Sequence, residues 1–253
     1  MIGLSLAPGL AEALMIAFAR IGTLVMLLPG LGERVLPARQ RLVLALALTV
    51  IVLPEVREGL AAAPGMPVRH LIAEALLGLA LGIMARLTLA ALDVAGVVMS
   101  QTVGLSMAMV LDPSRGQQGD ILSGFLRMFG LTLIFAADLH HVALAGIVGS
   151  YGAVPVGAGL PIGDLAELMI RLMGEVFHAG LRIAAPFLVF GLVFNVGLGL
   201  AAKLAPQVQL FFLAMPAGIL MGLAALALIL AVTARQIVAH TGAVFTLLFP
   251  AGG

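Results

Sequence analysis

The sequence contains no cysteine and no tryptophan, and Tyr151 is its only tyrosine. The absence of cysteine excludes disulfide bonds and thiolate metal sites. Charge is also scarce. Only 10% of the 253 residues are charged and the formal net charge is +1, whereas a soluble domain carries roughly 25% charged residues. Such a small, balanced charge does not indicate a nucleic-acid partner, and it is too little to cover a water-exposed surface.

Apolar residues take the place of the missing charge. They make up 62% of the chain, and the mean hydropathy of +1.20 indicates a membrane protein. Several charged residues nevertheless lie within or beside apolar runs, where each costs about 2.5–3.5 kcal/mol at the centre of a membrane helix. We expect the following side chains to face protein or a watery cavity: Glu12, Arg20, Glu74, Arg86, Asp93, Arg127, Asp138, Glu175 and Arg182.

The pattern of apolar runs predicts an all-α protein with seven helical stretches. We expect Pro54 to end the second stretch and Pro186 to kink the sixth, and we expect Asp164 to cap the start of the sixth. The fourth should stop at the Asp112–Pro113 dipeptide. The stretches lie at about 9–28, 38–53, 68–98, 99–111, 120–149, 165–203 and 207–239.

The last two stretches are separated by only a few residues, which include Pro206 and Gln207. So short a connection predicts an antiparallel helical hairpin with these two residues at its tip. The five earlier stretches are shorter and more irregular. We therefore expect two parts, an irregular helical part over residues 1–160 and a long hairpin over residues 161–253.

A strip of small residues and methionines over residues 104–114 interrupts the strong helices. Irregular backbone at membrane depth survives only where protein covers it or where it lines a cavity, and methionine packs around changing shapes. A gate or plug in a conduit is one interpretation. An ordinary turn at the membrane edge is the other, and composition alone favours it. The strip includes Gly104, Leu105, Ser106, Met107, Ala108, Met109, Asp112 and Pro113.

Asp138, His140 and His141 raise the question of a metal site. On a helix Asp138 and His141 share a face while His140 points elsewhere, so two ligands are available where more are needed. A hydrogen-bonding cluster at a helix end is the favoured interpretation, and the sequence predicts no metal site. It contains no pattern of a nucleophile with its base and no nucleotide-binding loop, so we expect neither an enzyme nor a bound cofactor.

Two further sets of charges share helix faces. Glu175, His178 and Arg182 suit either a proton relay or simple neutralisation within one helix, and neutralisation is favoured. Arg86 and Asp93 are seven residues apart, so they either neutralise each other or contact partner chains. Two glycine pairs, at 78 and 82 and at 218 and 222, have the spacing that allows helices to approach closely in lipid.

Motifs spread over nearly the full length resemble the FliR family of type III export-gate subunits. The order and spacing of these elements carry the resemblance, and the Asp-Pro and Ala-Pro-Gln elements are the most specific. They are Arg20-Ile21 followed by Pro29, Arg39-Gln40-Arg41, Glu74 with Gly78 and Gly82, the strip from Gly104 with its Asp112-Pro113 turn, His140-His141 with Ser150 and Pro155, Ala185-Pro186, and Leu204-Ala205-Pro206-Gln207 before Phe211-Phe212.

The resemblance implies a multi-pass protein of the bacterial inner membrane, in the flagellar basal body, with no bond-making chemistry. One copy would assemble with about five FliP-like and about four FliQ-like subunits, beside an FlhB-like subunit, around a conduit for unfolded export substrates. The first part of the chain would resemble FliP and the hairpin FliQ. By position, the strip over residues 104–114 would plug the closed conduit. The expected subunit contacts are Arg20, Glu74, Arg86, Asp93, Pro206 and Gln207.

Two alternatives stay open. The equivalent subunit of a virulence injectisome shares the resemblance. A small-molecule secondary transporter is an alternative of a different class, because transporters also use broken helices and charges near the membrane midplane. The sequence shows no inverted repeat, which disfavours the transporter.

Overall fold

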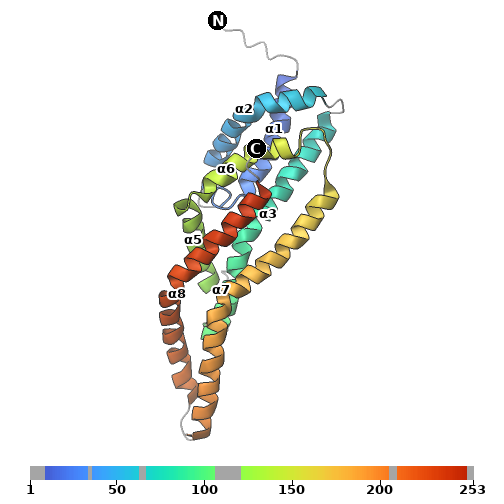
Figure 1. Ribbon diagram of the computed structural model, residues 1–253. Coiled ribbons are helices and arrows are strands. Elements are labelled where there is room, and N and C mark those ends of the chain that lie inside the picture. The colour runs from blue at the N-terminus through green and yellow to red at the C-terminus, as the bar shows by residue number, and fades with distance from the viewer. Residues whose placement is uncertain (1–8, 34–35, 63–66, 106–120, 205–209, 250–253) are drawn as a thin grey trace. The chain divides into compact units, whose positions relative to one another are not determined.

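The computed structural model describes residues 9–33, 36–62, 67–105, 121–204 and 210–249. Every regular element within these ranges is an α-helix (Figure 1), which confirms the all-α prediction. The helices are α1 (Leu10–Leu27), α2 (Ala38–Ala62), α3 (Pro67–Val103), α5 (Ile121–Ala136), α6 (Leu139–Ala153), α7 (Ile162–Leu204) and α8 (Leu210–Leu248).

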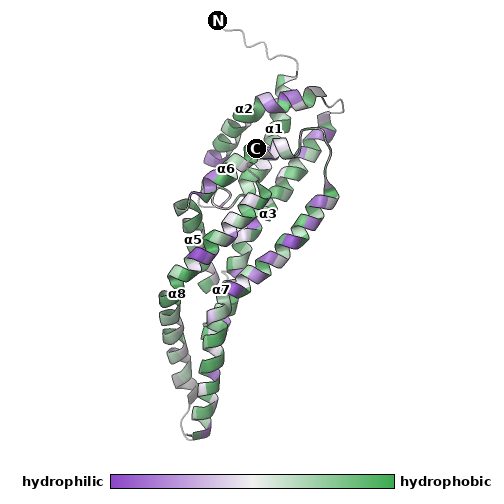
Figure 2. Ribbon diagram, viewed as in Figure 1, coloured by the Kyte–Doolittle hydropathy of each residue, from purple (hydrophilic) through white to green (hydrophobic). Residues whose placement is uncertain are grey.

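Four of these helices are long and apolar enough to cross a membrane. They are α1, α3, α7 and the Pro216–Leu248 part of α8, and the bent pair of α5 and α6 is a fifth candidate. Figure 2 shows hydrophobic residues dominating α8 and the second half of α7. These long apolar helices therefore indicate an all-α membrane protein.

The chain forms two compact units. Unit 1 comprises residues 1–87, 134–173 and 241–253, and unit 2 comprises residues 88–133 and 174–240. Helices α3, α5, α7 and α8 each contribute to both units. The division expected near residue 160 therefore does not coincide with the compact units.

Two helices run further than their sequences predict, because tertiary contacts support the extra turns. Helix α2 continues through Pro54 to residue 62, although an internal proline costs about 3 kcal/mol. Beyond the proline, Val56 is fully buried, and a Cβ atom at Gly59 would lie 3.4 Å from the side chain of Val156. Helix α8 continues to Leu248, where Phe245 and Phe249 are buried.

The third expected stretch continues without a break into the first residues of the fourth in helix α3, which ends at residue 103; residues 106–111 of the fourth stretch lie outside the described residues. Gly104 follows with φ +86°, a conformation that glycine adopts without steric cost. The N–H of Leu105 donates to the carbonyl oxygen of Ser100 at 3.0 Å, as in a Schellman ending. Glycine therefore ends α3, and the stop expected at Asp112–Pro113 lies outside the described residues.

The fifth expected stretch is two helices rather than one. Helices α5 and α6 meet at a break with a bend of 73°. Asp138 sits at the break with φ +56°, the only positive φ of a non-glycine residue in the described part of the chain. Helix α7 begins at Ile162, so Asp164 lies in its first turn rather than at its cap. An acidic side chain there still interacts favourably with the helix dipole.

Both glycine pairs lie where helices touch. In unit 1 a Cβ atom at Gly82 of α3 would lie 2.8 Å from the Cβ of Leu27 in α1, and Gly78 packs directly against the backbone of Arg20. In unit 2 Gly218 and Gly222 of α8 pack against Val103 at the end of α3. The close approach expected from the spacing is confirmed at both pairs.

Helices α7 and α8 lie against each other within unit 2 (Figure 1). A Cβ atom at Gly218 of α8 would lie 3.2 Å from the ring of Phe194 in α7. These two residues are equally far in sequence from position 206, as an antiparallel hairpin requires. The turn expected at Pro206 and Gln207 lies outside the described residues.

Candidate functional site

A buried polar cluster in unit 1 joins three helices around one guanidinium group. Arg20 of α1 is fully buried and forms an ion pair with Glu74 of α3. Its Nη1 donates to the carbonyl oxygen of Ser150 at 2.9 Å, and its Nη2 donates to that of Val154 at 2.8 Å. Both carbonyls lie at the C-terminal end of α6, where a positive charge is favoured, and the Ser150 carbonyl also accepts the N–H of Val154 at 3.0 Å. Arg20 therefore caps α6 and binds α3 at once.

Tyr151 completes this cluster. The Arg20 guanidinium carbon lies 4.0 Å from the centre of the Tyr151 ring, a distance at which a cation is attracted to an aromatic face. The Tyr151 hydroxyl donates to the carbonyl oxygen of Ala17 at 3.1 Å. In the sequence, Tyr151 stands out only as the single tyrosine. A lone tyrosine beside a serine in an apolar helix is the signal that could have predicted a buried polar partner.

The cluster changes the role of two expected subunit contacts. Arg20 and Glu74 were expected to reach partner chains, but their side chains are 0% and 5% exposed and bind one another. This pairing within the chain leaves little side-chain surface for a second subunit. Removing a charge from water is costly unless it is paired and hydrogen-bonded, and this chain supplies the partners itself.

Asp93 of α3 also has its partner within the chain. In unit 2 its carboxylate accepts a hydrogen bond from Nε of Arg127 at 3.2 Å and a second one from Nη2 of the same residue. Pairing of Asp93 with Arg86 was one expectation, but seven residues separate them by about 10 Å along a helix. Arg86 is exposed and remains a candidate for a subunit contact.

The expected plug is only partly described. Gly104 and Leu105 form the end of α3, and Ser106, Met107, Ala108, Met109, Asp112 and Pro113 lie outside the described residues, as do Pro206 and Gln207. The described segment nevertheless places the start of the strip directly after a helix of 37 residues.

A large apolar surface covers α7 and α8. Among its members, Leu192 of α7 is 67% exposed and Leu228 of α8 is 84% exposed. An apolar groove of about 420 Å³ also runs between α1 and α3, lined by Phe18, Met26 and Leu79 among others. Exposed apolar surfaces of this extent indicate contact with lipid or with other proteins.

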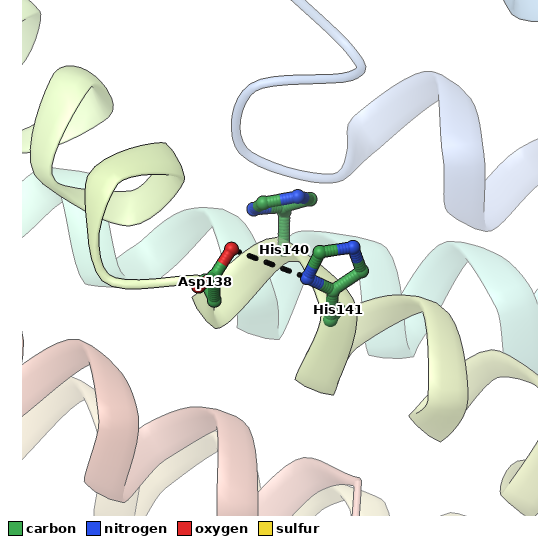
Figure 3. A group of neighbouring side chains, drawn as sticks. All are labelled: Asp138, His140 and His141. Carbon is green, nitrogen blue, oxygen red and sulfur yellow. Dashed lines mark ion pairs between the residues drawn. The ribbon is translucent and has the colours of Figure 1, made fainter.

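Asp138, His140 and His141 are the three residues in the described part of the chain that lie close enough to share a metal ion. Figure 3 shows their side chains beside one another at the start of α6. The two imidazole rings lie 4.0 Å apart between centroids, so His140 does not point away from His141 as the helical positions alone suggested. The rings extend far enough from the backbone to meet.

Fold and surface together define an integral membrane protein in which the charged side chains of Arg20 and Glu74 are paired inside the chain and the apolar faces of α7 and α8 are exposed. Residues 11–244 match the model of the family described as bacterial export proteins, family 1, and the chain belongs to this family. Members of this family are structural components of a transport apparatus and are not enzymes.

The chain is similar to curated proteins of several bacteria. It is 39% identical to the flagellar biosynthetic protein FliR of Caulobacter vibrioides, over 84% of this chain and 86% of that protein. It is 28% identical to the protein of the same name from Bacillus subtilis, over 82% of each chain. It is also 27% identical to the Yop proteins translocation protein T of Yersinia pestis, over 56% of each chain.

Proposed function

We propose that the chain is a core subunit of the type III protein export gate in the bacterial inner membrane, where it helps to form the conduit for unfolded proteins. The observation that carries this proposal is the match of residues 11–244 to one family of export proteins. Its apolar helices suit a membrane position. The chain contributes structure and closure, and no bond-making step is assigned to it.

The flagellar system is the favoured setting. Similarity to the Caulobacter FliR protein covers 84% of the chain at 39% identity. Similarity to the Yersinia translocation protein covers 56% at 27%. An injectisome subunit is therefore the second candidate. In cells that lack the chain, proteins that the flagellar system normally exports should accumulate inside the cell. If export of flagellar proteins is unaffected while export of injectisome proteins is blocked, the injectisome becomes the favoured setting.

The proposed partners are FliP-like, FliQ-like and FlhB-like subunits, with about five copies of the first and about four of the second around one copy of this chain. The hairpin of α7 and α8 supports this proposal, because its apolar faces are left uncovered by the chain itself. In this arrangement residues 1–160 take a FliP-like position and residues 161–253 a FliQ-like one. Arg86 and the hairpin tip at Pro206 and Gln207 are the proposed polar contacts.

The mass of the purified assembly tests the proposed partnership. The full chain is co-expressed with FliP-like and FliQ-like proteins, extracted in mild detergent and weighed by native mass spectrometry. We expect one copy of the chain in a mixed complex, and degraded or aggregated protein when it is expressed alone. A well-behaved monomer or a symmetric homo-oligomer would instead support a secondary transporter.

We also propose that residues 104–114 plug the closed conduit. The support is positional, because the strip follows the glycine-terminated end of α3. Small side chains and methionines seal a gap through weak contacts that are readily remade. Deleting the strip should leave assembly intact and raise the permeability of the membrane to ions and small dyes. Replacing Asp112 or Pro113 should give a smaller leak, whereas an assembled deletion variant as tight as wild type would reduce the strip to an ordinary turn.

A further inference from the structure

The elbow between α5 and α6 carries an unusual combination of backbone and side chain. Asp138 occupies the N-cap position of α6, yet its carboxylate makes no capping hydrogen bond. Aspartate at an N-cap normally accepts a bond from the backbone of the first turn. Here the residue adopts a left-handed conformation, which is uncommon outside glycine, and its carboxylate turns toward His141 instead (Figure 3).

The distance between these two groups is long for a charge-assisted hydrogen bond. Nδ1 of His141 lies 3.3 Å from Oδ1 of Asp138, whereas such bonds measure about 2.7–2.9 Å. Two ligands at about 2.0–2.1 Å from a tetrahedral zinc ion are separated by about 3.3 Å. The spacing of the nitrogen and the oxygen therefore suits two neighbouring ligands of a tetrahedral ion.

His140 provides the third donor. One potential ligand atom from each of Asp138, His140 and His141 lies within 4.8 Å of the others. In addition, Nδ1 of His140 is buried and has no hydrogen-bond partner in the described part of the chain. A buried polar atom without a partner is costly. This orphaned nitrogen is an observation independent of the cluster, and it points to a ligand.

We propose that Asp138, His140 and His141 bind a divalent transition-metal ion of the zinc type, and that the ion holds the α5–α6 elbow in its bent form. Two imidazoles and one carboxylate suit zinc and its neighbours better than magnesium or calcium, which prefer oxygen ligands. Asp138 and His141 are 78% and 68% exposed, so water completes the coordination. The carboxylate offsets the repulsion between a cation and the positive end of the α6 dipole.

The role of the ion follows from the position of its ligands. All three lie within four residues at the break where α5 and α6 diverge by 73°. A bound ion links the left-handed residue to the first turn of α6 and opposes straightening of the elbow. The site therefore has a structural role.

Metal binding to the full chain in detergent, with any subunits that stay bound, tests the proposal. After treatment with a chelator, the protein is titrated with Co²⁺, whose visible absorption reports tetrahedral coordination, and the ion is then displaced with Zn²⁺. We expect one ion per chain, and at least a tenfold loss of affinity in His140→Ala and in His141→Ala. Asp138→Gly should lose affinity as well, while its glycine accepts the left-handed backbone without strain.

His178→Ala is the matched control, because His178 is an exposed histidine on α7 and is not one of the proposed ligands. It should bind Co²⁺ like the wild type. Hydrogen exchange of the backbone amides of residues 138–141 should slow at least tenfold on addition of Zn²⁺ in the wild type and stay unchanged in Asp138→Gly. Equal binding by the wild type and the His140→Ala/His141→Ala double variant would overturn the site. Binding without a change in exchange would overturn the locking role.

Discussion

The helices of this chain differ in how much of their surface the chain itself covers. In the most apolar windows of α1 and α3, 44% and 56% of the residues are buried, whereas in those of α7 and α8 only 22% are buried. The first pair encloses the ion pair of Arg20 and Glu74 and approaches closely at two glycines. The second pair presents leucines and valines outward.

This difference separates two sources of stability. Helices α1 and α3 are held by contacts that the chain makes with itself, so changes there should act on the folding of the single chain. Helices α7 and α8 leave their apolar faces for lipid or for other subunits, so changes there should act on assembly. Four substitutions test this comparison, in decreasing order of their expected effect on the chain's own stability.

The largest effect is expected for Glu74→Ala. The substitution leaves the Arg20 guanidinium buried without its counter-ion, and breaking a buried pair costs about 3–5 kcal/mol. The melting temperature of the chain, co-expressed and purified in detergent with its proposed partner subunits and followed by helical circular dichroism, should fall steeply. Arg20→Met combined with Glu74→Leu should recover part of the loss, because no unpaired charge remains.

Arg69→Ala serves as the control for this prediction, since it removes an exposed charge from the same helix. Its melting temperature should match the wild type. If Glu74→Ala proves as stable as Arg69→Ala, the buried pair does not hold α1 and α3 together.

An intermediate effect is expected for Gly78→Ala. A Cβ atom at this position collides with the backbone carbonyl of Arg20 and with Thr23, and overpacking typically costs about 1–3 kcal/mol. Gly124→Ala is the matched substitution at a helical glycine with open space around it. It should be neutral or stabilising, by up to about 1 kcal/mol, because alanine favours the helix. Equal melting temperatures for the two variants would show that α1 and α3 do not pack tightly at Gly78.

A smaller effect is expected for Asp93→Asn. The Asp93 and Arg127 side chains are 36% and 42% exposed, and exposed ion pairs contribute about 0–1 kcal/mol. In denaturation measurements the variant should be slightly less stable than the wild type at low salt, and this difference should shrink at high salt. A loss as large as that of Glu74→Ala would mean that this pair is desolvated in the working protein, for example by a neighbouring subunit.

The smallest effect on the chain itself is expected for Leu228→Ser. The side chain is 84% exposed, so its removal leaves no cavity and should shift the melting temperature hardly at all. Co-purification with partner subunits should fall if α8 is an interface, because apolar area is lost from the contact. A melting temperature that falls as far as in Gly78→Ala would contradict the comparison, since α8 would then be covered by its own chain.

Sequence patterns predicted most of the helices correctly but misplaced some helix ends and breaks. The proline rule placed the end of α2 at residue 53, yet packing of Val56 and Gly59 carries the helix on to residue 62. The apolar run over residues 120–149 indicated one helix, because nothing in its composition announces the left-handed Asp138. Proline and glycine signals are local, and contacts between distant segments override them.

The candidate site shows the same division. The sequence singled out Arg20, Glu74 and Asp93 as charges that need partners, because a charge in an apolar helix is costly wherever it lies. It did not identify Ser150, Val154 and Arg127 as those partners, since they lie 130, 134 and 34 residues away in the chain. Two of these three bind through backbone carbonyls, which leave no trace in a side-chain pattern.

The sequence by itself determined the class of this protein, a set of long apolar helices with little charge, because composition and periodicity act residue by residue. The motif order also identified the export family, to which the match over residues 11–244 assigns the chain. Only the tertiary structure decided that Arg20 and Glu74 face each other inside the chain and that Asp138 meets two histidines at a bend. Those outcomes depend on how helices approach and where they break, and such distances are properties of the packed chain.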